Sequence, residues 1–97
     1  MIIDTHTHIF PDAIAQRAIA SLAEKAGDYT PHTEGTLQSL LSSMDEAGIH
    51  TSWIANIATK PSQTSSIITW SKQIVSERIF PLGSVYPYSE TWEKDIC

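Results

Sequence analysis

The chain opens with the stretch Met1-Ile-Ile-Asp-Thr-His-Thr-His8, which is the most informative part of the sequence. Its side-chain character alternates from one residue to the next, which predicts a short β-strand over residues 2–8. On a regular strand Asp4, His6 and His8 share one face, and the intervening residues point the other way, toward the helices. Residues two apart have Cα atoms roughly 6.5 to 7 Å apart, so two imidazoles can converge on one ion.

Two histidines on a strand are, in the simplest interpretation, ordinary surface or core histidines. An inward strand face of one aspartate and two histidines would, however, bury polar groups that a bound cation satisfies at once. We therefore predict that His6 and His8 ligate a divalent metal ion. Asp4 lies one step lower on the strand, where a carboxylate can orient a ligand or a neighbouring segment.

Working outward from the first strand, the sequence alternates between helix and strand patterns. A helix is expected from Asp12 until Gly27, and a second from a cap at Thr36 until Gly48. A third should run to about Glu77, and a fourth should begin at Trp92. Strands are expected near residues 2–8, 52–58 and 79–86. This order is typical of an α/β fold with a parallel sheet, either doubly wound or a (β/α)8 barrel.

The composition narrows the class of protein. The chain has 97 residues, which is one domain, with 41% hydrophobic and 18% charged residues and a net charge of -5. Because its lysines and arginines form no cluster, we expect neither nucleic acid nor a membrane as a partner. The single Cys97 and a start without the features of a secretion signal favour a cytoplasmic protein.

Two segments carry a family resemblance. Met1-Ile-Ile-Asp-Thr-His-Thr-His-Ile-Phe-Pro11 and Leu40-Leu-Ser-Ser-Met-Asp-Glu-Ala-Gly-Ile49 resemble the amidohydrolase superfamily. The likeness is to its amidohydrolase-related branch, which includes aminocarboxymuconate-semialdehyde decarboxylase, resorcylate decarboxylases and pyrone-dicarboxylate lactonase. The resemblance implies a distorted (β/α)8 barrel and a divalent metal, with Zn²⁺ the expected ion. The family holds its metal with the first-strand histidines, later histidines and a late aspartate, and only His6 and His8 have matching positions here.

The resemblance also implies a function. It indicates a metal-dependent hydrolase or decarboxylase that acts on a small organic acid, lactone or amide through a water molecule that the metal activates. The residues that move protons would come from the rest of the barrel, so we assign no catalytic residue here. A barrel of ~250 residues allots about 31 to each of its eight units. Residues 1–97 are therefore expected to be the N-terminal part, about three βα units, of one truncated barrel domain, inactive alone and prone to form a homo-oligomer.

Two other functions stay open. One is a metal-dependent phosphoesterase or nuclease of the TatD or PHP type, whose chains also open with a His-X-His strand. The other is a non-catalytic remnant that binds a metal ion or another chain.

The other conspicuous residues are assigned structural roles. His32 is interpreted as a solvated loop histidine, and His50 is expected at the amino end of its strand, away from the site. Packing or capping is favoured over pocket lining for a group of strand-end residues, namely Asn56, Thr59, Tyr86 and Tyr88. Asp45 and Glu46 are interpreted as solvated charges rather than an acid and base pair.

Overall fold

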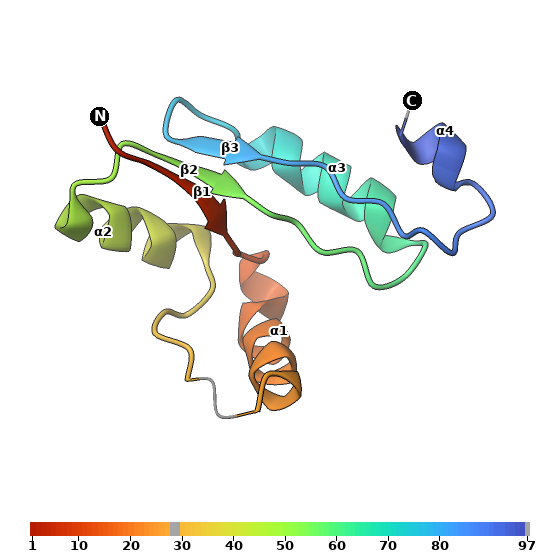
Figure 1. Cartoon of the computed structure of the whole chain (residues 1–97), viewed down its shortest axis with the longest axis horizontal. Helices are drawn as coiled ribbons and strands as arrows, with labels where there is room; N and C mark the ends of the chain where they lie inside the picture. The colour runs from red at the N-terminus through yellow and green to blue at the C-terminus, as the bar shows by residue number, and fades with distance from the viewer. Residues whose placement is uncertain (28–29, 97) are drawn as a thin grey trace.

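The computed structural model describes residues 1–27 and 30–96 of the chain. Its elements run in the order β1 (Ile3–Thr7), α1 (Asp12–Lys25), α2 (Leu37–Ala47), β2 (Thr51–Ile54), α3 (Gln63–Ile74), β3 (Ile79–Pro81) and α4 (Trp92–Ile96). The three strands form one parallel sheet in the order β1-β2-β3 (Figure 1). The predicted α/β class and parallel sheet are therefore confirmed.

The helix boundaries follow from local signals in the sequence. The Thr36 hydroxyl caps α2 by accepting a hydrogen bond from the Ser39 N–H at 3.1 Å. Gly48 ends α2 in the left-handed conformation, at φ 71°, where a side chain would be strained. The third helix ends at Ile74 rather than near Glu77, because Val75 is extended and the Ser76 N–H donates to the Ile79 carbonyl at 3.0 Å.

The core lies on one face of the sheet. Met44 of α2, Ile54 of β2 and Ile79 of β3 are buried there together with Ile9. Further apolar side chains of α2 and α3 pack around this cluster, namely Leu37, Leu40, Leu41, Trp70 and Ile74. Both helices thus bury their apolar stripes against the same side of the strands.

The opposite face of the sheet is open. Trp53 and Phe80 lie side by side on it, with ring centroids 5.7 Å apart, and they are 38% and 50% exposed. The accessible surface of 6961 Å² exceeds the ~5500 Å² typical of a compact protein of this mass. The radius of gyration, 14.0 Å, likewise exceeds the ~12.5 Å expected for this length.

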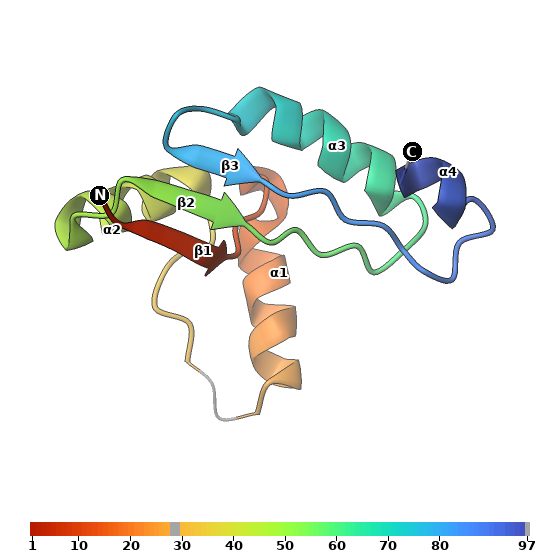
Figure 2. The same ribbon diagram turned by 45° about the horizontal axis from the view of Figure 1, so that its top comes forward.

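Helix α1 contributes to this excess surface. It projects away from the sheet instead of packing along it (Figures 1 and 2). Ala15 near its start is buried, whereas Ile14 and Leu22 remain more than a third exposed. The α1 helix and the loop that returns to α2 therefore stand at the carboxyl end of β1, outside the layer formed by α2 and α3.

The second and third strands are shorter than the predicted ranges of 52–58 and 79–86. Beyond Ile54 the two chains stay side by side, but side chains replace the ladder of main-chain hydrogen bonds. The Asn56 side-chain amide donates to the Leu82 carbonyl at 2.7 Å, and the Ala58 N–H donates to the Ser84 hydroxyl at 3.0 Å.

None of the helices in residues 1–27 and 30–96 combines the length and apolar character needed to cross a lipid bilayer.

Candidate metal-binding site at the carboxyl end of the first strand

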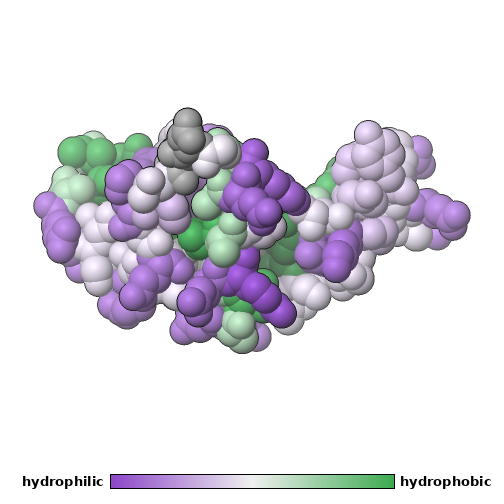
Figure 3. All heavy atoms as spheres, turned by 90° about the horizontal axis from the view of Figure 1, so that it is seen from below, coloured by the Kyte–Doolittle hydropathy of each residue, from purple (hydrophilic) through white to green (hydrophobic). Residues whose placement is uncertain are grey.

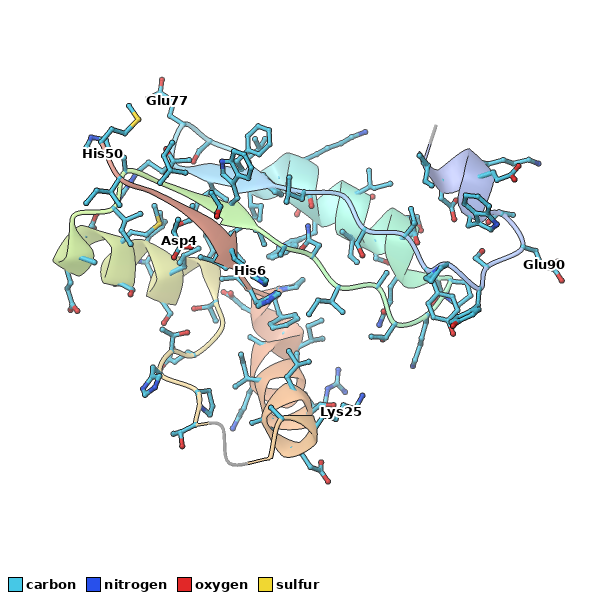
Figure 4. The ribbon with its side chains drawn as sticks, in the orientation of Figure 1. Asp4, His6, Lys25, His50, Glu77 and Glu90 are labelled. Atoms are coloured by element: carbon cyan, nitrogen blue, oxygen red, sulfur yellow. The ribbon has the colours of Figure 1, made fainter. Side chains whose placement is uncertain are left out.

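His6 and His8 lie where β1 ends and the chain turns toward α1. His50 lies at the opposite end of the sheet, as predicted (Figure 4). Carboxyl ends of parallel strands are where α/β proteins build their sites, because the loops there are free to vary. The length of the sheet therefore separates His6 and His8 from His50, and replacing His50 is a suitable control for replacing either predicted ligand.

The ring of His8 is fixed by a main-chain contact. Its Nδ1 lies 2.8 Å from the carbonyl oxygen of Ala55, just beyond β2. A carbonyl oxygen only accepts hydrogen bonds, so in the neutral ring Nδ1 carries the proton and Nε2 presents a lone pair. Metal-ligating histidines are held in the same way, with the second ring nitrogen donating to a carbonyl or carboxylate.

The two rings meet through their outer nitrogens. Nε2 of His6 and Nε2 of His8 are 3.1 Å apart, and the ring planes cross at 73°. Two nitrogens that share a tetrahedral Zn²⁺ at about 2.0 to 2.1 Å are about 3.3 Å apart. The pair thus already has nearly the spacing of two ligands on one ion, and without an ion the His6 N–H can donate to the His8 lone pair.

The strand that carries these rings is irregular. Asp4 pairs with Ser52 and Thr7 pairs with Ile54, so β1 uses one residue more than β2 between the two pairs. The extra residue is a β-bulge, a feature that re-aims side chains and is frequent beside active sites. The simple alternation predicted for residues 2–8 is therefore interrupted between Asp4 and Thr7.

Asp4 contacts His6 through the main chain. Its Oδ1 accepts the His6 N–H at 3.1 Å, inside the bulge. The register places Asp4 beside Ser52, a residue fully buried on the helix-covered side. The prediction that Asp4 shares one face with His6 and His8 is therefore wrong, because the irregular register turns Asp4 toward the helix-covered side, where its carboxylate contacts the His6 main chain.

Beyond the bulge, at the carboxyl end of β1, hydrogen bonds of Thr7 join the strand to β2. The Thr7 hydroxyl donates to the Trp53 carbonyl at 2.7 Å, and the Ala55 N–H donates to the Thr7 carbonyl at 2.8 Å. Because the Ala55 carbonyl also accepts from His8, residues 53–55, at and just beyond the end of β2, contact both the strand and the ring. Hydrogen bonds to β2 and to Ala55 therefore hold in place the backbone that carries the two imidazoles.

The two rings form part of the lining of a cleft of about 550 Å³. The other lining residues come from α1, the loop after it and the segment after β2, namely Ile19, Leu22, Ala23, Ala26, Pro31, His32, Thr33 and Ile57. Figure 3 shows apolar atoms (green) in recesses near the middle of the lower face, between polar side chains (purple). Most of the cleft wall is thus apolar, and its polar lining residues are the three histidines and Thr33.

His32 is the lining residue whose position differs most from the sequence interpretation. It was expected to be a solvated loop histidine, and it is exposed, but it also borders the cleft of His6 and His8. Gly35 in the same loop adopts φ +74° and packs against Ile19 of α1.

The remaining predicted residues have mainly structural contacts. Besides Leu82, Asn56 donates to Ser71 of α3, and Thr59 donates to the Gln63 side chain through both its N–H and its hydroxyl. Both belong to a second, smaller groove between α1 and α3. Tyr86 and Tyr88 contact each other, with ring centroids 5.7 Å apart.

Asp45 is exposed, as predicted, and it also forms a surface ion pair. It pairs with Arg78 at 2.7 Å, and Arg78 also donates to the Ile49 and His50 carbonyls. This contact ties β3 to the end of α2.

Among residues 1–27 and 30–96, no group of three or more His, Cys, Asp or Glu side chains gathers closely enough to hold a metal ion. His6 and His8 can therefore fill two positions of a tetrahedral site, and further ligands must come from elsewhere. Comparison of the chain with family models, curated proteins and solved structures finds no match.

Proposed function

We propose that this chain forms the first three βα units of a metal-dependent (β/α)8 barrel enzyme, a hydrolase or decarboxylase that acts on a small organic acid, lactone or amide. The observation that carries the proposal is the 3.1 Å separation of the His6 and His8 Nε2 atoms at the carboxyl end of β1. The resemblance of the opening segment to the amidohydrolase-related branch supports the same reaction class.

The open sheet face supports the barrel. In a (β/α)8 barrel the helices cover the outside and the inner face of the strands is filled by side chains from the other strands. Here α2 and α3 cover one face, while Trp53 and Phe80 on the other face are 38% and 50% exposed. Five further βα units would bury this face and bring the missing ligands to the same end of the sheet.

The chain's own residues would perform three tasks. His6 and His8 would hold the cation through Nε2, Ala55 would keep the His8 ring in the tautomer that binds, and α1 would supply apolar contacts to the substrate. A divalent cation, when bound, polarises a carbonyl or carboxylate group and lowers the pKa of water. The proton-transferring acid or base is proposed to lie outside residues 1–97.

The test is turnover by the complete barrel protein that contains these residues. Acid release from lactones and amides and CO₂ release from carboxylated substrates are measured before and after chelation, with the His6→Ala variant and His50→Ala as its matched control. The proposal expects chelation and His6→Ala to abolish most turnover, with recovery on adding Zn²⁺ to the parent. Turnover that survives both treatments would reject it, and cleavage of phosphodiesters alone would establish the nuclease alternative.

A further inference from the structure

We propose that His32 is a specificity-determining residue, which contacts the end of the ligand remote from His6 and His8. This inference rests on the proposed function, because it assigns one end of the ligand to the metal-binding pair. It goes beyond that function by naming the residue that binds the other end of the ligand.

The lining of the cleft locates the polar contacts. His6 and His8 enter from β1, whereas His32 enters from the loop between α1 and α2. His32 does not group with the pair closely enough to share an ion. The other lining residues include the apolar side chains Ile19 and Leu22 of α1.

The loop that carries His32 is anchored near its end. The Gly35 carbonyl accepts the Phe10 N–H at 2.8 Å, and Gly35 packs so closely on Ile19 that a Cβ would approach the Ile19 side chain to 2.6 Å. The Glu34 N–H also donates to the Ser39 hydroxyl of α2 at 3.2 Å. These contacts fix Glu34 and Gly35, two and three residues after His32, against Ser39 of α2 and Ile19 of α1, and both His32 and Ile19 line the cleft.

The chemistry of the cleft then defines the ligand. A cation held by His6 and His8 would bind an oxygen atom of the ligand. The apolar wall would pack against a short hydrocarbon chain, and the His32 imidazole would donate a hydrogen bond to an oxygen at the other end. A ligand with an oxygen group at each end satisfies both sides. A ligand that lacks the distal oxygen leaves the His32 donor without its partner in the cleft and binds less tightly.

The test uses two probes of equal carbon number with the Zn²⁺-saturated chain. Glutarate has a carboxylate at each end, and pentanoate has a methyl group where glutarate has the second carboxylate. Isoleucine methyl NMR signals report binding, with Ile19 and Ile57 inside the cleft and Ile68, on the exposed side of α3, as the control. The variants are His32→Ala, His32→Gln, which retains an N–H donor, and His50→Ala as a matched control.

We expect the parent and His50→Ala to bind glutarate about tenfold more tightly than pentanoate, with shifts at Ile19 and Ile57 but not at Ile68. The preference should vanish in His32→Ala and persist in part in His32→Gln, while Zn²⁺ affinity stays at the parent value in both. An unchanged preference in His32→Ala, or equal shifts at Ile68 and Ile19, would overturn the inference.

Failure of the proposed function is a separate outcome. If the parent takes up no Zn²⁺, the metal-dependent function fails, and the glutarate titration is repeated on the metal-free chain. Shifts at Ile19 and Ile57 that disappear in His32→Ala would still sustain the role of His32. Their absence in the parent would overturn that role as well.

Discussion

The carboxylate of Asp4 accepts a hydrogen bond from the main-chain N–H of His6 at 3.1 Å, inside the bulge that makes β1 irregular. A bulge leaves main-chain groups without partners in the ladder, and this contact satisfies one of them. Asp4 therefore fixes the backbone from which the His6 ring approaches His8. The acidic residue of the opening motif acts on the first histidine through the main chain.

Replacing Asp4 with Ala removes this acceptor and should weaken Zn²⁺ binding by about tenfold, because the His6 ring loses its orientation. The free energy of unfolding should fall by about 1 kcal/mol. Asp4→Asn keeps an Oδ1 acceptor and should remain near the parent, as should Thr5→Ala next to it. Calorimetric Zn²⁺ titration and urea denaturation of the three variants check this. Equal Zn²⁺ affinity in Asp4→Ala and the parent would contradict a positioning role.

Gly35→Ala should destabilise the chain more than Gly48→Ala. Both glycines have positive φ, which costs an alanine about 1 to 2 kcal/mol. At Gly48 the added Cβ meets nothing within 4 Å, whereas at Gly35 it meets the Ile19 side chain at 2.6 Å. Overpacking should add about 1 to 3 kcal/mol at Gly35.

Denaturation of both single variants and of Gly35→Ala combined with Ile19→Ala measures this difference. The double variant should recover the excess cost, because the clash partner has been shortened. Equal destabilisation by the two single glycine variants would show that the loop does not depend on its contact with α1.

The open face of the sheet predicts self-association of the isolated chain. Trp53 and Phe80 expose apolar surface beside strand edges, and such surfaces pair with other chains in water. Sedimentation velocity over a range of concentrations should show oligomers for the parent and mostly monomer for a Trp53→Thr, Phe80→Thr variant. Tyr88→Thr, which removes an aromatic residue exposed in a loop, should behave like the parent. A parent that stays monomeric throughout would contradict the prediction.

Much of the fold could be predicted from local patterns. The Thr36 cap and the left-handed Gly48 depend on neighbouring residues only, so the bounds of α2 were predictable. The parallel order of the strands followed from the alternation of strands and helices. The early ends of β2 and β3 were not predictable, because they depend on contacts such as that of Asn56 with Leu82, which are distant in sequence.

The candidate site was predictable only in part. The convergence of His6 and His8 follows from their spacing, which is a local property. The bulge at Asp4 depends on how β1 pairs with β2, and the position of His32 depends on the packing of Gly35 against Ile19. Tertiary contacts of this kind leave no periodic signal in a single sequence.

The central claim is that His6 and His8 together bind one divalent cation, and calorimetric titration of the chain with Zn²⁺ tests it most directly. The parent and His50→Ala should each bind one Zn²⁺ per chain, weakly and reversibly on adding a chelator, because two ligands do not close a tetrahedral site. His6→Ala and His8→Ala should each bind about tenfold more weakly or not at all. Equal binding by all four proteins, or no binding by the parent, would contradict the claim.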